Sequence, residues 1–241
     1  MERFDVLLSK EINISREKAK ELIISGRVNL DGTVLKKPSK LLNSLGKVYI
    51  SELNTKYVSR GGYKLEQAIK NFKIDVKDKI CLDIGASTGG FTDCLLKHNA
   101  KLVYGIDVGT NQLNKELLNN KRVISMENTN IRNLDIVSKL PKFDIVVVDV
   151  SFISISLVLP IIYKLLLQNG ICISLIKPQF EVGKKFLNKK GVVNDKKAID
   201  TCLKNIYIIA SSLNFNVSIP IESSLLGKNG NKEYFYKLEK R

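Results

Sequence analysis

Two apolar runs of the chain each end in a charged residue. Residues 143–148 run into Asp149, and residues 170–176 run into Lys177. Continuous runs of this kind are typical of strands buried on both faces of a parallel sheet, and in open α/β sheets the ligand site lies outside the carboxyl ends of the strands. One such charge would more often mark only the point where a strand meets solvent. Two at matching positions, with the strand-stopping Pro178 after Lys177, predict an acid and an amine facing one crevice.

Two lysines and two acids together could promote one specific reaction, methyl transfer to a ribose 2′-hydroxyl. This hydroxyl is a very weak acid and must lose its proton as the methyl group arrives. A lysine at its reference pKa of about 10.4 is protonated and cannot accept that proton. A second lysine and partial burial lower a lysine pKa, while carboxylates hold the geometry. For each residue alone a surface charge is the simpler interpretation, but four candidates occupy matching places in the predicted fold: Lys64, Asp149, Lys177 and Glu233.

Two other methylation chemistries fit the sequence less well. Enzymes that methylate exocyclic amines typically carry Asp/Asn-Pro-Pro-Tyr/Phe after the fourth strand, where this chain has Asp149-Val150-Ser151-Phe152. Carbon-5 methylation of pyrimidines uses a nucleophilic cysteine near the strand ends, and here the Thr201-Cys202 pair lies inside a predicted amphipathic helix. The ribose hydroxyl is therefore the favoured acceptor.

A glycine-rich turn follows the first strand of the predicted sheet. Its glycines let a ligand approach the backbone, and the helix start behind it favours a carboxylate or phosphate. The Gly-x-Gly-x-x-Gly spacing of a dinucleotide site is absent, and Asp107 after the second strand could accept both ribose hydroxyls of an adenosine. This pattern favours S-adenosylmethionine over NAD. The candidate cofactor residues are Asp83, Gly85, Ala86, Ser87, Thr88, Gly89, Gly90, Phe91, Asp107, Val108, Asn128, Thr129, Asn130 and Asp149.

These residues need an α/β scaffold, and the patterning from residue 80 onward predicts one. Strand and helix patterns alternate, which is the signature of a doubly wound, Rossmann-like fold with a seven-stranded, mostly parallel sheet. A long helix is expected over 196–213. The expected strands are 80–84, 102–106, 123–126, 143–148, 171–176, 216–221 and 233–238.

The first 50 residues have a different pattern, that of a small α+β domain. Ser15 can cap a helix over 16–25, Gly26 can end it, and the Asp31-Gly32 pair can turn a hairpin. We therefore expect a domain over 1–50, a polar linker over 51–57 and the larger domain over 58–241.

Composition narrows the class of protein. The 39 Lys and Arg against 24 Asp and Glu give a net charge of +15, which attracts polyanions such as nucleic acid. No run approaches the roughly 20 apolar residues of a membrane span, and the N-terminus lacks a signal-peptide pattern, so a cytoplasmic protein without membrane contact is expected. His98 is the only histidine, which argues against a His-based zinc site or a Ser-His-Asp triad. We expect no metal.

Two parts of the chain resemble known families. Residues 1–50 are similar to the S4 RNA-binding domain, in the segments 3–5, 15–19, 22–23, 26–28 and 31–32. The span 56–239 resembles the FtsJ-like 2′-O-methyltransferases, and the combination resembles the TlyA family, whose members are sometimes labelled haemolysins. The motifs that carry the second resemblance are 59–64, 83–92, 149–154, 177–184 and 230–235.

The resemblance implies methylation of a cytidine ribose 2′-hydroxyl in ribosomal RNA. The partner is then ribosomal RNA or a ribosomal subunit, with 23S rRNA favoured and 16S rRNA left open, and S-adenosylmethionine is the methyl donor. The four residues form the catalytic tetrad, in which we predict Lys177 to be the base, Asp149 to orient it, and Lys64 and Glu233 to position the ribose.

The same resemblance directs the basic residues toward RNA, which is recognised largely by shape and phosphate contacts. The predicted RNA contacts are Arg3, Arg16, Lys18, Lys20, Arg27, Arg60, Phe180, Lys184, Lys185 and Lys189. Two alternatives stay open: a membrane-active haemolysin, and an RNA-binding module whose methyltransferase domain is inactive.

Overall fold

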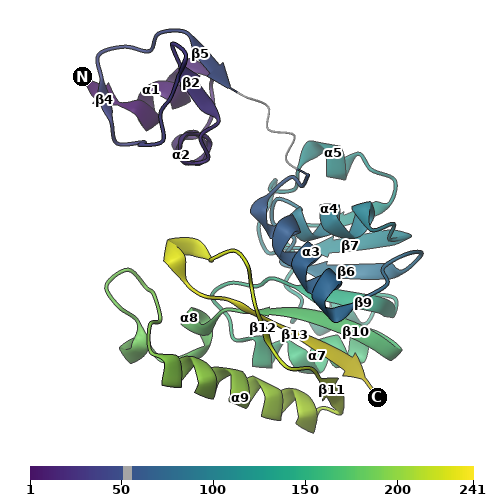
Figure 1. The fold of residues 1–241 in the computed structure, drawn as a ribbon. Coiled ribbons are helices and arrows are strands. Elements are labelled where there is room, and N and C mark those ends of the chain that lie inside the picture. The colour runs from purple at the N-terminus through teal and green to yellow at the C-terminus, as the bar shows by residue number, and fades with distance from the viewer. Residues whose placement is uncertain (51–55) are drawn as a thin grey trace. The chain divides into compact units, whose positions relative to one another are not determined.

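The chain divides into two compact units, Met1–Thr55 and Lys56–Arg241. The computed structural model describes residues 1–50 and 56–241 (Figure 1). Most of the expected linker, residues 51–55, lies outside the described residues. Its last residue, Tyr57, is 1% exposed and packs into the core of the second unit.

The first unit is a small α+β domain around a core of Phe4, Leu8 and Ile23. The Ser15 hydroxyl accepts a hydrogen bond from the Lys18 amide at 3.2 Å, which caps the second helix as expected, and Gly26 follows that helix with a φ of +72°. The predicted helix and hairpin are therefore confirmed. The elements are β1 (Glu2–Arg3), α1 (Phe4–Glu11), α2 (Arg16–Ile24), β2 (Val28–Leu30), β3 (Thr33–Val34), β4 (Leu41–Leu42) and β5 (Val48–Ile50).

The second unit is built on one large sheet with the strand order β11-β13-β10-β9-β6-β7-β8, and β12 pairs with β13 beside this path. Strands β6 to β10 run parallel, and β13 runs antiparallel to β10 and β11. The strands are β6 (Ile80–Ile84), β7 (Leu102–Ile106), β8 (Val123–Met126), β9 (Phe143–Val148), β10 (Leu166–Ile176), β11 (Phe215–Val217), β12 (Ile221–Glu222) and β13 (Tyr234–Lys240).

Two strand predictions were wrong in detail. The expected strand 171–176 is only the last part of β10, which begins at Leu166. The expected strand 216–221 is two strands, so the sheet has eight strands rather than seven. Val217 pairs with Leu238 and Ile221 pairs with Phe235, which leaves three residues on one side opposite two on the other. The intervening residues include Pro220, which has no N–H to donate and cannot continue a ladder.

Helices cover both faces of this sheet, and the strands alternate between two cores (Figure 1). Cys81 and Val147 pack with α3 and α4, whereas Leu82 and Val146 pack with α7 and α9. The helices are α3 (Arg60–Phe72), α4 (Gly90–Lys97), α5 (Lys115–Leu118), α6 (Leu134–Val137), α7 (Leu159–Leu165), α8 (Pro178–Glu181) and α9 (Lys196–Ser212), with 3₁₀ turns η1 (Ile155–Leu157), η2 (Lys184–Phe186) and η3 (Lys228–Gly230). Among the described residues, no helix is long and apolar enough to cross a membrane.

The sheet changes winding direction between β6 and β9. The chain proceeds from β6 outward to β7 and β8, then returns to β9 on the other side of β6. The ends of β6 and β9 are in register, with Ile84 opposite Val148, and the Asp149 amide donates to the Ile84 carbonyl at 2.9 Å. Such a switch point is where open α/β sheets bind ligands.

Candidate active site

The glycine turn begins where β6 ends, and its backbone is fixed by close packing. Gly85 has a φ of +85°, and a Cβ on it would lie 2.5 Å from the Asp149 carbonyl oxygen. Only glycine permits this approach. The Asp107 carboxylate accepts the Ser87 amide at 2.8 Å and the Gly109 amide at 2.7 Å, which joins the turn to the end of β7.

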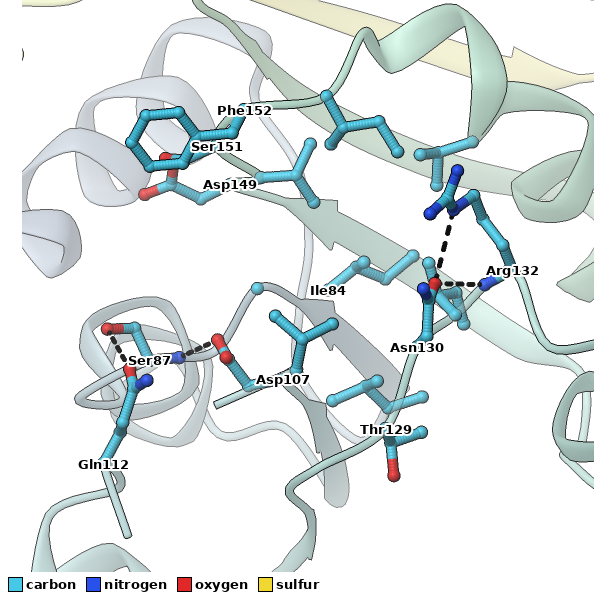
Figure 2. Close-up of a pocket in the computed structure, with 17 residues that line it drawn as sticks. Ile84, Ser87, Asp107, Gln112, Thr129, Asn130, Arg132, Asp149, Ser151 and Phe152 are labelled. Atoms are coloured by element: carbon cyan, nitrogen blue, oxygen red, sulfur yellow. Dashed lines mark hydrogen bonds between the residues drawn. The ribbon is translucent and has the colours of Figure 1, made fainter. Parts of the chain in front are cut away.

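A cavity of about 500 Å³ opens beside this turn (Figure 2). Its volume lies in the range of small-ligand sites, roughly 300 to 1,000 Å³. Carboxylate, amide and hydroxyl groups line it together with apolar side chains such as Ile84 and Ile106. The predicted cofactor residues among its lining are Gly85, Ser87, Asp107, Val108, Thr129, Asn130 and Asp149.

Several lining residues were missed at the sequence level. Gln112 accepts a hydrogen bond from the Ser87 hydroxyl at 3.1 Å, and the Asn130 side-chain oxygen accepts from the Arg132 amide at 3.0 Å (Figure 2). Gln112 is held by Glu127, whose carboxylate accepts the amides of residues 111–113 at 2.6 to 3.0 Å. These three bonds lower the pKa of Glu127. No local sequence pattern predicts these three hydrogen bonds, because the Glu127 carboxylate and its donors lie about 15 residues apart in the sequence.

Three predicted cofactor residues lie outside the cavity linings. Asp83 is fully buried behind the turn and accepts a hydrogen bond from the Thr92 hydroxyl at 2.7 Å; burial raises its pKa to about 7. A Cβ on Gly89 would lie 2.3 Å from the Leu117 side chain, so the absence of a side chain at Gly89 allows Leu117 to pack against the turn. Asn128 lies in the loop after β8, where its amide donates to the Gly109 carbonyl at 2.9 Å. These residues shape the loops around the cavity.

A second, smaller cavity of about 140 Å³ also borders the turn. Lys64 lines it together with Ser59 and Gly61, and so do Ala86, Thr88, Gly90 and Phe91 of the glycine turn. Asp149 lines both cavities. The structure thus places Lys64 near the strand-end acid that borders the larger cavity.

The four tetrad candidates form two ion pairs. Lys177 Nζ lies 2.6 Å from Asp149 Oδ1 and donates to the Ser151 hydroxyl at 2.9 Å. Asp149 Oδ1 is buried without a hydrogen-bond partner, so its contact with Lys177 is a charge pair off hydrogen-bond geometry. Lys64 Nζ donates to Glu233 Oε2 at 2.6 Å.

Sheet register explains why these residues meet. Strands β10 and β13 pair Ile176 with Tyr234, so Lys177 and Glu233 are the next residues on each strand beyond that pair. Lys64 reaches the same edge from α3, which packs on the sheet through Leu65, Ala68 and Ile69. The apolar stripe of α3 therefore turns Lys64 inward, and its side chain is only 11% exposed.

The predicted RNA residues near this site differ in their contacts. Arg60 donates to the Leu226 carbonyl at 2.8 Å and so ties α3 to the loop before β13. The Phe180 ring contacts the Phe152 ring in a tilted arrangement with ring centroids 4.9 Å apart, and Phe152 itself is 89% exposed. Lys184, Lys185 and Lys189 are exposed.

Two predicted RNA residues of the first unit converge on a buried acid. Arg3 and Arg16 each lie 2.9 Å from the carboxylate of Asp5, which is fully buried, while both arginines are partly exposed. Hydrogen bonds from Arg3 and Arg16 lower the Asp5 pKa to about 2. Lys18 pairs with Glu21 at 3.0 Å on the exposed side of α2. Lys20 and Arg27 are partly exposed.

Other chemistries find little support in the site. Cys202 is buried in α9, and burial raises the pKa of its thiol to about 12. Within residues 1–50 and 56–241 no group of three or more His, Cys, Asp or Glu side chains is placed to hold a metal ion.

Comparison with known proteins decides the family. Residues 57–240 match the FtsJ-like methyltransferase model, and residues 2–47 match the S4 domain model. The chain is 38% identical to the 23S rRNA (cytidine-2′-O)-methyltransferase TlyA of Campylobacter jejuni over 97% of this chain and 98% of that protein. The chain belongs to the TlyA family. It is a methyltransferase with an N-terminal S4 domain.

Two further TlyA-family relatives extend the comparison. The 16S/23S rRNA (cytidine-2′-O)-methyltransferase TlyA of Mycobacterium tuberculosis is 38% identical over 95% of this chain and 86% of that protein. A solved structure from Streptococcus thermophilus that carries a hemolysin label is 39% identical, covers 99% of this chain and 88% of its own, and superposes with a TM-score of 0.77. A hemolysin label thus accompanies the same methyltransferase fold, and the haemolysin alternative is not supported.

Proposed function

We propose that this TlyA-family methyltransferase transfers a methyl group from S-adenosylmethionine to the 2′-hydroxyl of a cytidine in ribosomal RNA. The observation that carries the proposal is the pair Lys177–Asp149, 2.6 Å apart, whose carboxylate partner Asp149 lines a cavity of about 500 Å³. The relatives from C. jejuni and M. tuberculosis are both named for this reaction, and 23S rRNA is in both names. We therefore favour the large subunit, and with it a cytoplasmic enzyme.

The larger cavity fits the adenosine part of the methyl donor. Asp107 can accept the two ribose hydroxyls, because its carboxylate is already held in place by the Ser87 and Gly109 amides. Thr129 and Asn130 line the cavity beyond it, where the adenine edge is expected. Gly85 has no side chain and leaves the turn open to the donor. When bound, the donor would supply its sulfonium methyl group, whose bond to sulfur breaks as the bond to oxygen forms and leaves a neutral thioether.

Lys177 is suited to remove the hydroxyl proton. In its unprotonated form the amine can take the proton as the new oxygen–methyl bond forms, and Asp149 and Ser151 hold Nζ in one place. Asp149 then stabilises the protonated amine by its charge. Lys64 lines the smaller cavity, and the buried Glu233, 2.6 Å away, holds its Nζ in place as a polar group that can position the ribose.

Each unit offers side chains that can contact RNA: the second unit has lysines and aromatic rings, and the first unit has arginines. Exposed lysines of residues 184–190 can contact phosphates near the site, and Phe152 and Phe180 offer aromatic faces on which a base can stack. In the first unit, Asp5 holds Arg3 and Arg16 side by side, as two guanidinium groups suited to phosphate oxygens.

The test is transfer of labelled methyl from S-adenosylmethionine to isolated 50S subunits, isolated 30S subunits and naked ribosomal RNA. We expect label in the large subunit, none with Lys177→Ala, and normal transfer with Glu116→Gln, an exposed acid on α5. Failure of the wild-type protein to label any of the three substrates would contradict the proposal and favour an inactive RNA-binding module.

A further inference from the structure

Two segments that leave neighbouring strands are tied to each other at three points. The first segment follows β9 (residues 149–155), and the second follows β10 (residues 177–181). Lys177 contacts Asp149 and Ser151 at the base of the pair of segments, and the Phe152 and Phe180 rings meet at 4.9 Å further out. Glu181 makes the third connection.

Phe152 has a backbone conformation that needs support. Its φ is +63°, a left-handed value that is rare for a bulky aromatic residue and costs free energy. Because its side chain is 89% exposed, burial does not offset that cost. Some other interaction must hold the loop in this conformation.

Glu181 supplies such an interaction. Its Oε2 accepts the Ser154 hydroxyl at 2.6 Å, and its Oε1 accepts the Ile155 amide at 2.8 Å. Both donors lie two or three residues after Phe152. The carboxyl is half-buried; burial raises its pKa, and the two hydrogen bonds oppose that rise. Hydrogen bonds to a charged group in a partly buried environment are among the stronger polar contacts.

We propose that Glu181 is a positioning residue for the RNA side of the reaction. By holding Ser154 and Ile155, it keeps the 149–155 loop in the strained conformation that sets Phe152 beside Phe180 and Ser151 beside Lys177. The nucleotide to be methylated then contacts a preformed aromatic surface next to Lys177, the proposed general base. This inference rests on the proposed function, because the RNA substrate comes from there.

A matched comparison is available on the cofactor side. Glu127 has the same chemistry, a carboxylate that accepts backbone amides of a loop, but its loop carries Gln112 of the larger cavity. Glu181→Ala should raise the KM for RNA at least about tenfold and leave the Kd for S-adenosylmethionine unchanged. Glu127→Ala should raise the Kd for S-adenosylmethionine and leave the KM for RNA unchanged. Glu181→Gln keeps an acceptor oxygen and should recover part of the loss.

Amide exchange gives a readout that does not depend on activity. The Ile155 amide should exchange faster in Glu181→Ala than in the wild type, while amides of β6 and β9 keep their protection. If the wild-type protein transfers no methyl to RNA, the proposed function fails, and exchange together with RNA filter binding still tests the positioning role. Wild-type KM and wild-type Ile155 exchange in Glu181→Ala would overturn the inference. Equal losses on the RNA and cofactor sides would also overturn it, since they would indicate general unfolding.

Discussion

The two ion pairs of the site have the same length and different surroundings. Lys177–Asp149 and Lys64–Glu233 are each 2.6 Å apart. The two lysines are exposed to nearly the same extent, 12% for Lys177 and 11% for Lys64, so the difference lies in the carboxylates: the Asp149 side chain is 24% exposed and borders two cavities, whereas the Glu233 side chain is 3% exposed. A Cβ on Gly227 would lie 1.9 Å from Glu233 Oε1, so the loop closes tightly over that pair.

Because of this difference, the two lysine–carboxylate pairs are suited to different tasks. A pair whose carboxylate is open to a cavity can exchange a proton with a substrate, and a pair whose carboxylate is enclosed by protein mainly fixes positions. Enclosed charges depend strongly on each other, because removal of one partner leaves the other buried and uncompensated. The open pair should therefore govern rate, and the enclosed pair should govern stability and ribose placement.

Replacing Lys177 should give the largest effect on rate. Lys177→Ala removes the base and should lower kcat by roughly 100- to 10,000-fold, with the Kd for S-adenosylmethionine unchanged. Lys177→Arg keeps the positive charge beside Asp149 but cannot deprotonate, so it should be as inactive. Single-turnover methyl transfer measures both, and substantial activity in the arginine variant would contradict the base assignment.

Breaking the enclosed pair should mainly destabilise the protein. Glu233→Gln leaves Lys64 buried without its counter-charge and should lower the free energy of unfolding by about 3 to 5 kcal/mol. The double variant Lys64→Met with Glu233→Leu should recover most of that loss while remaining inactive. Urea unfolding of the three proteins provides the measurement. An unchanged midpoint in Glu233→Gln would show that the pair is not enclosed in solution.

Asp5 is another buried carboxylate in an ion pair, but it differs from Glu233 because its two arginine partners are partly exposed. Asp5→Asn should lower the stability of the first unit by about 1 to 3 kcal/mol. The Asp5 pKa of about 2 lies below its ordinary value of 3.8, so the ionised form stabilises the fold above pH 4, and this contribution is lost as the pH falls toward 2. Amide exchange of residues 1–50 in wild type and Asp5→Asn at pH 5 and pH 2 tests this, and a variant that loses as much stability at pH 2 as at pH 5 would refute it.

Ser151 should give the smallest effect. Ser151→Ala removes one hydrogen bond to Lys177 but leaves Asp149 in place, and a single bond of this kind contributes about 1 kcal/mol, or roughly fivefold in kcat. Steady-state kinetics on the RNA substrate measures the change. A loss as large as that of Lys177→Ala would mean that Ser151, and not Asp149, sets the position of the amine.

The sequence predicted the features that depend on local pattern. Strands β6 to β9 appear at the expected residues, and the cap at Ser15 and the glycine after α2 follow from short-range chemistry. The glycine turn directly follows the first parallel strand, so it must lie at the carboxyl edge of the sheet. The cavity of about 500 Å³ is found beside it. The roles of Lys64, Asp149, Lys177 and Glu233 remain predictions.

What the sequence could not supply are contacts between distant segments. Glu127 and Glu181 each hold a loop through bonds that span from about 14 to 27 residues, and no periodicity signals them. The split of the predicted 216–221 strand depends on which residues of β13 lie opposite, and a pattern read along one strand does not contain that register. The left-handed backbone of Phe152 likewise has no signature in its residue type.

If Lys177 takes a proton from a ribose hydroxyl, the transferred methyl group must lie on that oxygen, so its chemical position decides the role of Lys177. Ribosomal RNA methylated by the wild-type protein with labelled S-adenosylmethionine is digested to nucleosides and separated. We expect the label in 2′-O-methylcytidine and its absence from the product of Lys177→Arg. Label on a base, or on the ribose of another nucleoside, would contradict this account.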